Sequence, residues 1–198
     1  MDHVKELGEP VPEKPVLFLK PPSVLHQALS NAPLKLELPV GAGMVHHECE
    51  IVLRLNRSGY RLSLAEAQSA IGWVSLGLDM TLRDRQNGLK KNGHPWETSK
   101  VFPGSAVVGP WLTVSEFPQW VKEPFRFSIN GLLRQQGNAA QMRFSPAACV
   151  SYASEFFPLC EGDLIYTGTP AGVGPVLSGD NGRLEWGKIS FSVLWSPR

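Results

Sequence analysis

The sequence predicts a single β-rich α+β domain, and three observations support this prediction. Short apolar or alternating segments of strand length recur along the chain, with turn residues between them. The 19 glycines and 17 prolines among 198 residues are more than a helical protein usually contains and fewer than a disordered chain contains. Only three longer stretches combine a helix-start signal with helix-forming residues, so we expect modest helices around a framework of strands.

In the first half of the chain, strands and helices are expected to alternate. The expected elements are a helical turn at 2–7, a buried strand at 16–20, a strand at 47–55, a helix at 63–72, a strand at 73–79 and a helix at 81–91. Prolines within 10–22 prevent a helix there, because proline lacks the backbone N–H and clashes with the preceding turn. Ser63 and Glu66 have the spacing of a capping box, which favours a helix start. Asn92 and Gly93 are typical of a helix end.

The second half carries one hairpin signal and one helix signal. Asn130 and Gly131 favour the tight turn of a β-hairpin within 125–135, since both residue types tolerate a positive φ. Ser145 followed by Pro146 is a typical helix start, with a capping side chain and then proline at the first helical position. The remaining expected elements are the rest of that helix to about residue 157, a strand at 164–167 and a strand at 188–195.

Composition and charge argue against several classes of protein. Lysine and arginine number 19 against 18 for aspartate and glutamate, so the formal net charge is +1, which disfavours nucleic acid or an anionic membrane as the main partner. No uninterrupted apolar run approaches membrane length and the charged start lacks the pattern of a signal peptide, so we expect a cytoplasmic protein. Cys49, Cys149 and Cys160 are too widely spaced for a disulfide framework or a zinc pattern. His46 and His47 lack a suitably spaced partner for zinc.

Three carboxylates form the most informative pattern in the chain. Glu48 and Glu50 alternate on the strand expected at 47–55, so both side chains project from the same face. Asp79 ends the strand expected at 73–79, where a loop-facing carboxylate can meet that pair. A hard divalent cation such as Mg²⁺, Mn²⁺ or Ca²⁺ would offset their mutual repulsion. The pattern alone leaves two alternatives open, which are a solvated strand face for the pair and a helix cap for Asp79.

Short segments in a fixed order over nearly the whole chain indicate a family. They are HVKE at 3–6, LKP at 19–21, HECE at 47–50, LDMTLRDRQ at 78–86, PWETSK at 95–100, NG at 130–131, MRFSP at 142–146 and GDLIYTGTPAGVG at 162–174. With these segments the chain resembles the small single-domain branch of the fumarylacetoacetate hydrolase family. The resemblance implies a mixed β-roll or β-sandwich of many short strands with a few peripheral helices. It implies one catalytic domain over residues 1–198, without the N-terminal strand that usually precedes the first helix.

The resemblance implies a metal centre and a lysine that faces the substrate. Glu48, Glu50 and Asp79 would be the ligands of Mg²⁺ or Mn²⁺, with Ca²⁺ as an alternative in crystals. Three protein oxygens would leave about three octahedral positions for water and substrate. By the same resemblance, Lys100 would reach the substrate and neutralise the charge of an enolate. Its sequence context alone would also suit an exposed lysine.

Five further residues are candidates for the site, of which His3 and Glu6 follow from the resemblance. His3 and Glu6 would form the catalytic dyad that deprotonates water, and their spacing of three allows a hydrogen bond, although such a pair is also typical of a frayed helix end. Arg83 and Gln86 share a helix face and could hold a carboxylate and a carbonyl, or simply form a solvated face. Thr169 could offer its hydroxyl and backbone N–H to a substrate carboxylate, or serve as a turn residue.

Two classes of function follow from this interpretation. The first is a divalent-metal-dependent hydrolase that cleaves a carbon–carbon bond in a small acylpyruvate-type 2-oxo acid through a metal-stabilised enolate. The same enolate would serve an oxaloacetate decarboxylase or a 2-oxo acid isomerase or tautomerase, so these reactions remain alternatives. The second class is a metal- and ligand-binding dimer without catalysis.

The expected partners are a small 2-oxo acid and a second copy of the chain, because the family usually forms homodimers. Neither nucleic acid nor a membrane is expected. Trp111, Phe117, Trp120 and Phe125 are candidates for an apolar contact patch, and they could equally belong to the core.

Overall fold

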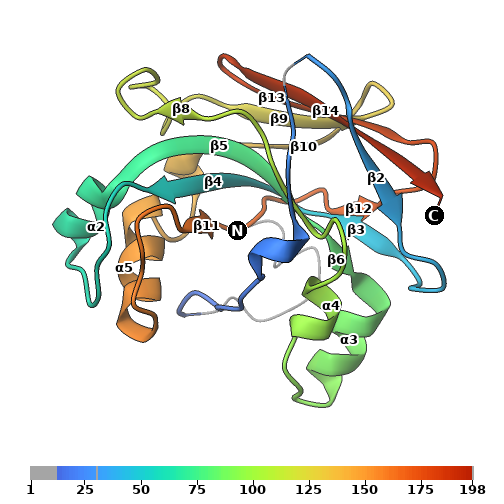
Figure 1. Cartoon of the computed structure of the whole chain (residues 1–198), viewed down its shortest axis with the longest axis horizontal. Coiled ribbons are helices and arrows are strands. Elements are labelled where there is room, and N and C mark those ends of the chain that lie inside the picture. Colours follow the sequence, from blue (N-terminus) through green and yellow to red (C-terminus); the bar gives the residue numbers. More distant parts are fainter. Residues whose placement is uncertain (1–12, 30, 198) are drawn as a thin grey trace.

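The structure, a computed structural model of the chain, describes residues 13–29 and 31–197. Their strands form a six-stranded, a five-stranded and a three-stranded sheet. Figure 1 shows the five-stranded sheet on one side of the curved strands β4 (Cys49–Leu55) and β5 (Ile71–Asp79), with helices α2 (Leu64–Ala70) and α5 (Pro146–Phe156) on the other side of one end of that pair. The predicted β-rich α+β fold is confirmed.

Each sheet joins parts of the chain that lie far apart in the sequence. The six-stranded sheet has the order β1 (Leu25–Gln27), β7 (Ala106–Val108), β5, β4 and β11 (Leu164–Tyr166), and β8 (Leu112–Thr113) also pairs with β5. The five-stranded sheet has the order β10 (Leu132–Gly137), β9 (Phe125–Ile129), β13 (Asn181–Trp186), β14 (Ile189–Pro197) and β2 (Leu34–Leu38). The three-stranded sheet has the order β12 (Gly174–Pro175), β3 (Val45–His47) and β6 (Thr81–Leu82). The remaining helical elements are α3 (Arg83–Lys91), α4 (Glu97–Lys100) and the 3₁₀ turns η1 (Pro22–Val24) and η2 (Ala139–Gln141).

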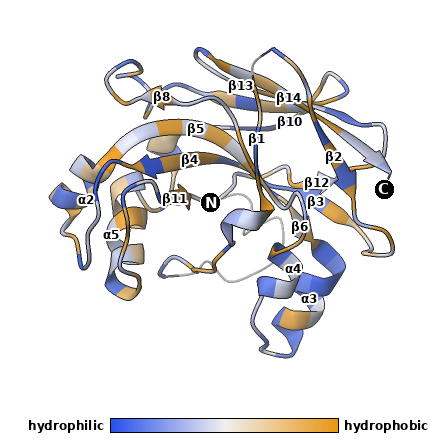
Figure 2. Cartoon of the chain, in the orientation of Figure 1, coloured by the Kyte–Doolittle hydropathy of each residue, from blue (hydrophilic) through white to orange (hydrophobic). Residues whose placement is uncertain are grey.

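One apolar cluster joins the two larger sheets. Along β13 and β14, buried residues alternate with exposed or half-buried ones, so one face of this sheet packs inward and the other meets solvent. Strand β4 is buried at every position except Arg54, as expected of a strand covered on both faces. Leu53 of β4, Phe127 of β9 and Phe191 of β14 are fully buried members of the same cluster. Figure 2 shows apolar residues along β5 and mostly hydrophilic residues on α3.

Two parallel strand pairs close long loops of chain. β1 pairs with β7, and β2 pairs with β14 so that Leu36 lies opposite Trp195. The hydroxyl of Ser196 donates to the carbonyl of Leu36, 160 positions earlier, at 3.4 Å. Parallel strands cannot be joined by a tight turn, so such pairs need long connections.

The predicted local signals are confirmed. Ser63 and Glu66 form a complete capping box at the start of α2, and the Ser145 side chain caps α5. Asn130 (φ 51°) and Gly131 (φ 79°) form the turn between β9 and β10, with the two positive φ values that a type I′ hairpin turn needs. The strand expected at 47–55 is interrupted at Glu48, between β3 and β4, and the helix expected from 81 begins at Arg83, after β6.

The strand expected at 16–20 is a wrong prediction. The segment forms no strand, and Val16, Leu17 and Leu19 are exposed. The segment is attached to the rest of the molecule by the side chain of Lys20, which contacts the candidate metal centre described below. The helical turn expected at 2–7, with His3 and Glu6, lies outside the described residues.

The proposed apolar contact patch is largely core. Phe117, Trp120 and Phe125 are 2%, 4% and 3% exposed, and Trp186 packs edge-on against Phe117 and Trp120, with ring centroids 5.0 and 6.2 Å away. These three aromatic side chains are therefore packed inside this chain, whereas Trp111 is half-buried.

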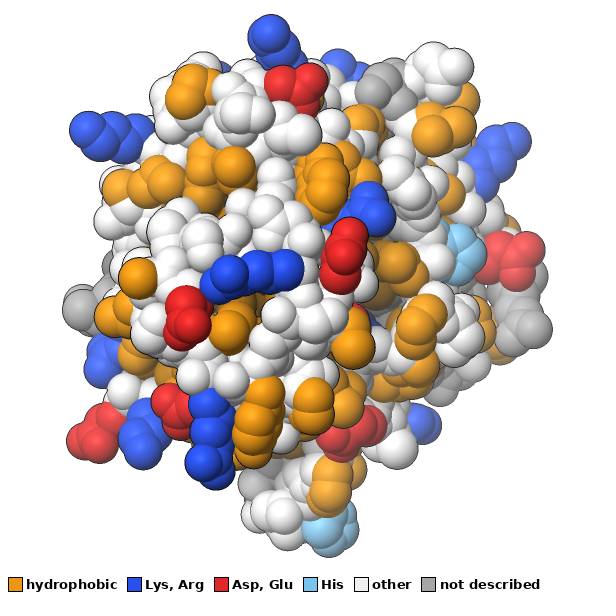
Figure 3. Space-filling model, turned by 60° about the vertical axis from the view of Figure 1, so that its left-hand side comes forward, with side chains coloured by type: hydrophobic (Ala, Val, Ile, Leu, Met, Phe, Trp, Pro, Cys, Tyr) orange, Lys and Arg blue, Asp and Glu red, His pale blue; other side chains and the backbone are white. Residues whose placement is uncertain are grey.

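The described surface has mixed character. On the face seen in Figure 3, apolar, basic and acidic side chains are interspersed, as expected for a formal net charge of +1. No helix within residues 13–29 and 31–197 is long and apolar enough to cross a membrane.

Candidate metal centre

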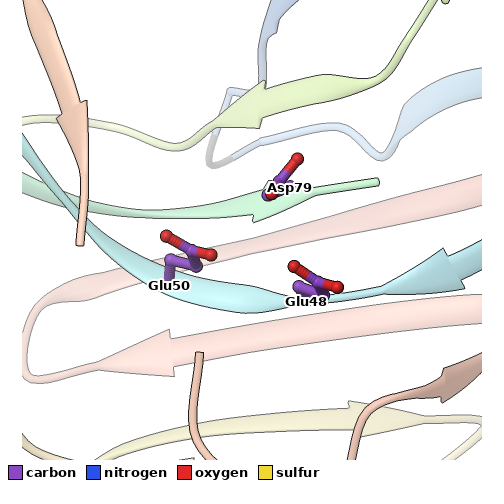
Figure 4. Close-up of side chains that lie close together, drawn as sticks. All are labelled: Glu48, Glu50 and Asp79. Carbon is purple, nitrogen blue, oxygen red and sulfur yellow. The ribbon is translucent and has the colours of Figure 1, made fainter. Parts of the chain in front are cut away.

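Three buried carboxylates meet where β4 begins and β5 ends. Glu50 lies on β4, Glu48 immediately precedes that strand, and Asp79 is the last residue of β5. The backbone N–H of Asp79 donates to the carbonyl of Glu48 at 2.9 Å, which fixes the two strand ends beside each other. Glu48 and Glu50 project from the same side of β4, toward Asp79, and one ligand oxygen of each residue lies within 4.8 Å of the others (Figure 4). The structure therefore brings the expected triad together, with each residue at most 6% exposed.

Lys100, at the end of α4, lies against this triad. Its ammonium group donates to Glu48 Oε2 at 2.8 Å, to Asp79 Oδ2 at 2.6 Å and to the hydroxyl of Thr81 at 2.7 Å. Burial lowers the pKa of Lys100, but the carboxylates of Asp79 and Glu48 outweigh burial and raise it, so the side chain carries a positive charge. Since Lys100 is 2% exposed, the alternative of a solvated lysine does not apply.

Lys20 is a site residue that the sequence reasoning missed. Its Nζ lies 2.7 Å from Asp79 Oδ1, a charge pair without the alignment of a hydrogen bond. Nζ also donates to the carbonyls of Ser105 at 2.8 Å, Met80 at 3.3 Å and Lys100. Burial lowers the pKa of Lys20 despite the neighbouring Asp79. The signal that could have identified it was its place in the LKP segment at 19–21.

Arg83 and Gln86 share a buried helix face, as their spacing predicted. The guanidinium of Arg83 donates to Glu48 Oε1 and to Gln86 Oε1, both at 2.5 Å, and its Nε donates to His46 Nδ1 at 3.3 Å. Arg83 and Gln86 are 5% and 3% exposed, which excludes a solvated face. In this arrangement Arg83 orients Glu48. Contact of Arg83 or Gln86 with a substrate stays a prediction.

Glu48 and Glu50 have opposite electrostatic surroundings. Burial raises the pKa of Glu48, but Lys100 and Arg83 outweigh it and lower the pKa to about 2. Burial, together with the charges of Asp79 and Glu48, raises the pKa of Glu50 to about 8. The backbone N–H that Gly168 donates to Glu50 at 2.6 Å acts in the opposite direction and lowers this pKa. Without a cation, Glu50 is therefore mostly protonated at neutral pH.

The donor set fits a hard divalent cation. It consists of carboxylate oxygens alone, and the charge of such a cation would let Glu50 ionise beside Glu48 and Asp79. Within the described residues, no histidine or cysteine joins the cluster.

The loop after β11 packs against β4 beside the triad. The hydroxyl of Thr167 donates to the carbonyl of Ile51 at 2.8 Å, and that of Thr169 donates to the carbonyl of Cys49 at 2.8 Å. In this structure the proton of the Thr169 hydroxyl is therefore directed at β4. Contact of the Thr169 hydroxyl or backbone N–H with a substrate carboxylate stays a prediction.

The aromatic ring of Phe18 covers Lys100 on another side. Lys100 Nζ lies 5.0 Å from the ring centroid of Phe18, and Phe18 lies 6.3 Å from Trp96. Such a ring face stabilises an ammonium group and limits its contact with water.

His47 and Cys49, the neighbours of Glu48 in the sequence, are both buried. His47 is 1% exposed, its Nδ1 is 2.9 Å from Gln135 Oε1, and burial lowers its pKa to about 4, so the ring is neutral at neutral pH. Cys49 is fully buried on the face opposite the carboxylates, and burial raises its pKa well above the usual value. The expected dyad of His3 and Glu6 lies outside the described residues, so its place at this site stays a prediction.

The sequence model of the fumarylacetoacetate hydrolase C-terminal domain matches residues 1–190. The chain belongs to the fumarylacetoacetate hydrolase family. Within this family, it is 40% identical over 181 residues to the oxaloacetate tautomerase YcgM of Escherichia coli, a match that covers 90% of this chain and 80% of that protein. It is 38% identical over 179 residues to the mitochondrial oxaloacetate tautomerase FAHD1 of Homo sapiens, covering 90% and 79% of the two chains.

Solved structures of family members have the same fold. The fumarylpyruvate hydrolase from Pseudomonas aeruginosa, crystallised with Mn²⁺ and pyruvate, superposes with a TM-score of 0.93 at 33% identity over 99% of this chain and 85% of that chain. A family protein from Yersinia pestis superposes with a TM-score of 0.90 at 36% identity, covering 98% and 87%. The prediction of the family from short ordered segments is thus confirmed.

Proposed function

We propose that the protein is a divalent-metal-dependent enzyme acting on a small 2-oxo acid, and that its reaction is the keto–enol tautomerisation of oxaloacetate. The observation that supports this most directly is the ammonium group of Lys100, buried between Glu48 and Asp79 at the candidate metal centre. The identities of 40% and 38% to two oxaloacetate tautomerases support the same reaction.

Glu48, Glu50 and Asp79 would hold the cation, which we propose to be Mg²⁺ or Mn²⁺. When bound, it would act as a Lewis acid on the adjacent carbonyl and carboxylate oxygens of the 2-oxo acid. The chain would hold its ligands ready for this role, because Arg83 orients Glu48 and the N–H of Gly168 orients Glu50.

Lys100 would stabilise the charge that develops during tautomerisation. A proton leaves the carbon next to the carbonyl, and negative charge collects on the carbonyl oxygen until that oxygen is protonated. A fixed ammonium group beside this oxygen lowers the barrier, because it needs no reorganisation when the charge appears. The ring of Phe18 lies over the ammonium group, and Lys100 is 2% exposed, so little water screens its charge and its electrostatic effect is stronger.

Hydrolysis of an acylpyruvate is the second candidate. The similarity to the fumarylpyruvate hydrolase from Pseudomonas aeruginosa supports it. This reaction additionally needs a base that deprotonates water, and we propose His3 with Glu6 for that role. Decarboxylation of oxaloacetate and hydrolysis of an acylpyruvate both leave the enolate of pyruvate, whereas tautomerisation of oxaloacetate breaks no carbon–carbon bond and releases no pyruvate. One set of assays therefore separates the three reactions.

The test is turnover by the purified protein with Mn²⁺ or Mg²⁺ and again with excess EDTA. Ultraviolet absorbance follows the enol of oxaloacetate, and a coupled assay measures pyruvate. EDTA-sensitive loss of the enol without pyruvate supports the tautomerase. EDTA-sensitive formation of pyruvate from oxaloacetate favours the decarboxylase, and cleavage of acetylpyruvate or fumarylpyruvate favours the hydrolase. Tight binding of Mn²⁺ and oxalate without any turnover would favour the non-catalytic dimer instead.

The matched variants are Lys100→Met and Lys91→Met. Lys91 is exposed at the end of α3, so its replacement is expected to leave turnover unchanged. Lys100→Met is expected to lower kcat about 100- to 1000-fold, the usual cost of removing one group that stabilises an oxyanion. Equal kcat values for the two variants would contradict the role proposed for Lys100.

We also propose that the protein is a homodimer, as the family resemblance implies. Because Phe117, Trp120 and Phe125 are in the core, the contact would use other apolar residues, such as the exposed Leu132 and Leu133 on edge strand β10. Light scattering coupled to size-exclusion chromatography measures the mass, and a mass of one chain would overturn this proposal.

A further inference from the structure

Gln135 is buried on a strand whose neighbouring residues are exposed. It is 1% exposed, whereas Leu133, Arg134 and Gln136 on the same strand, β10, are exposed. The register between β10 and β9 shifts between Leu133 and Gln135, which marks a β-bulge. A bulge turns a side chain away from the regular alternation of a strand, and here it directs Gln135 into the molecule.

The side-chain amide of Gln135 is bonded at both ends. Its Oε1 lies 2.9 Å from the backbone N–H of Cys49 and 2.9 Å from Nδ1 of His47. Its Nε2 donates to the hydroxyl of Thr169 at 2.7 Å and to the carbonyl of Pro170 at 3.0 Å. A backbone N–H can only donate and a carbonyl can only accept, so the orientation of the amide is fixed independently at each end.

These bonds connect the two segments that shape the metal centre. Cys49 lies between Glu48 and Glu50 in the sequence, so its N–H belongs to the backbone that carries both ligands. Thr169 follows Gly168, whose N–H donates to Glu50 Oε2 at 2.6 Å. One amide therefore joins the ligand-bearing strand to the loop that contacts a ligand.

The loop and β10 are in close contact. Gly172 has a φ of +93°, and a Cβ added there would lie 2.0 Å from the carbonyl oxygen of Arg134. A side chain at this position would push the loop away from β10 and from Gln135. The close approach keeps Thr169 and Pro170 within reach of the amide.

We propose that Gln135 is a positioning residue for the metal centre, which clamps the loop of Thr169 and Pro170 to β4 and so holds the carboxylate of Glu50 in its ligand geometry. The inference rests on the proposed function, because it assumes that Glu50 binds a divalent cation. Gln135 itself does not touch the triad; it acts through the loop and through the backbone of Cys49.

The test measures the affinity for Mn²⁺ by electron paramagnetic resonance, without substrate. Gln135→Met keeps the length of the side chain but loses all four bonds, and it is expected to weaken Mn²⁺ binding about 10- to 100-fold, the usual effect of losing a residue behind a metal ligand. The control is Gln136→Met on the exposed side of the same strand, which is expected to bind Mn²⁺ like the wild type. Circular dichroism verifies that each variant is folded, and Gln135→Asn is measured in the same way if Gln135→Met does not fold.

A double-mutant cycle with Thr169→Val separates positioning from a general structural effect. If Gln135 acts through the loop, the effects of the two changes on Mn²⁺ affinity are less than additive. Thr169→Val removes the contact with Gln135 that Gln135→Met has already lost, and in addition only the bond from Thr169 to the carbonyl of Cys49. Fully additive effects, or unchanged affinity of Gln135→Met, would overturn the inference. A wild-type protein that binds no Mn²⁺ would overturn the proposed function instead, and binding without turnover would count against the reaction while leaving this inference intact.

Discussion

The two ends of the β4–β5 strand pair bury opposite kinds of side chain. At one end, Leu53, Leu55 and Val74 are fully buried in the apolar core. At the other end, Glu50 and Asp79 are buried to nearly the same degree. One antiparallel ladder, with a register shift between Arg54 and Leu55, joins the two ends, so they share a framework and differ in chemistry.

The difference separates the apolar side chains that stabilise the fold from the carboxylates of the candidate metal centre along one pair of strands. Burial of apolar side chains is favourable by about 25 cal/mol per Å². Burial of carboxylates is unfavourable unless cations and hydrogen bonds offset the loss of hydration. Lys20, Lys100 and Arg83 offset it for Glu48 and Asp79, whereas Glu50 depends on a proton or a bound metal.

The largest expected effect comes from Glu50→Ala at the charged end. We expect metal-dependent turnover to fall on the order of 1000-fold, because a ligand is lost, while the fold remains intact. Thermal unfolding in EDTA should remain a single cooperative transition, because the apolar core beside β4 and β5 is unchanged. Full activity together with tight Mn²⁺ binding would refute the assignment of Glu50 as a ligand.

Leu53→Ala at the apolar end should lower the stability of the fold and leave metal binding unchanged. We expect a loss of about 2–5 kcal/mol in the free energy of unfolding from the cavity and the lost burial, and a melting temperature roughly 10 °C lower. The affinity of the folded variant for Mn²⁺ should stay within about twofold of the wild type. Leu64→Ala, at an exposed position on α2, is the control and should change stability by less than about 0.5 kcal/mol.

The raised pKa of Glu50 predicts how metal binding depends on pH. The folded, metal-free protein keeps a proton on Glu50 up to about pH 8, and a cation must displace it. Affinity for Mn²⁺ should therefore rise by about tenfold per pH unit below pH 8 and level off above it. Titrations of Mn²⁺ between pH 6 and 9 measure this slope, and a flat profile would contradict it.

The carboxyl group of Glu50 should also make the stability of the metal-free protein, measured in EDTA, depend on pH. Its pKa is about 8 when folded, above the ordinary value of 4.5, so the folded state binds more protons between these values. The contribution of Glu50 to stability is therefore fully present below about pH 4.5 and is lost as the pH rises through about 8. Urea unfolding of Glu50→Gln should lack this decline, because the amide does not titrate.

The smallest expected effect is that of Ser63→Ala, in the capping box of α2 beneath the apolar end. Removal of the cap should cost about 1 kcal/mol in the free energy of unfolding. Turnover and Mn²⁺ affinity should not change, since α2 lies away from the charged end (Figure 1). A measurable loss of metal affinity in this variant would show that the two ends are coupled.

Much of the site could be predicted because its residues lie in short local patterns. Glu48 and Glu50 share a strand face, Arg83 and Gln86 share a helix face, and the LDMT segment places Asp79 at a strand end. Sequence periodicity captures such neighbours directly. The same holds for the hairpin at Asn130 and for the capped helices.

Contacts between distant segments were beyond prediction. The apolar run at 16–20 has the composition of a strand, and only the ion pair between Lys20 and Asp79 shows why it is a bound loop. β13 was missed for another reason, because its residues alternate between exposed and buried and it forms a local hairpin with the adjacent β14, signals that the sequence did carry. The bulge that buries Gln135, by contrast, depends on pairing with β9. Such features follow from tertiary pairing and leave no periodic trace.

The parallel pairing of β2 with β14 has a consequence for biosynthesis. The segment of Leu36 leaves the ribosome long before Trp195, its partner opposite, has been translated. Until then the backbone groups of β2 that pair with β14 have no partner. At a rate of synthesis of about 5–20 residues per second, the interval is roughly 10–30 seconds. The parallel pair of β2 and β14 therefore forms only after nearly the whole chain has been synthesised, so this part of the sheet assembles last.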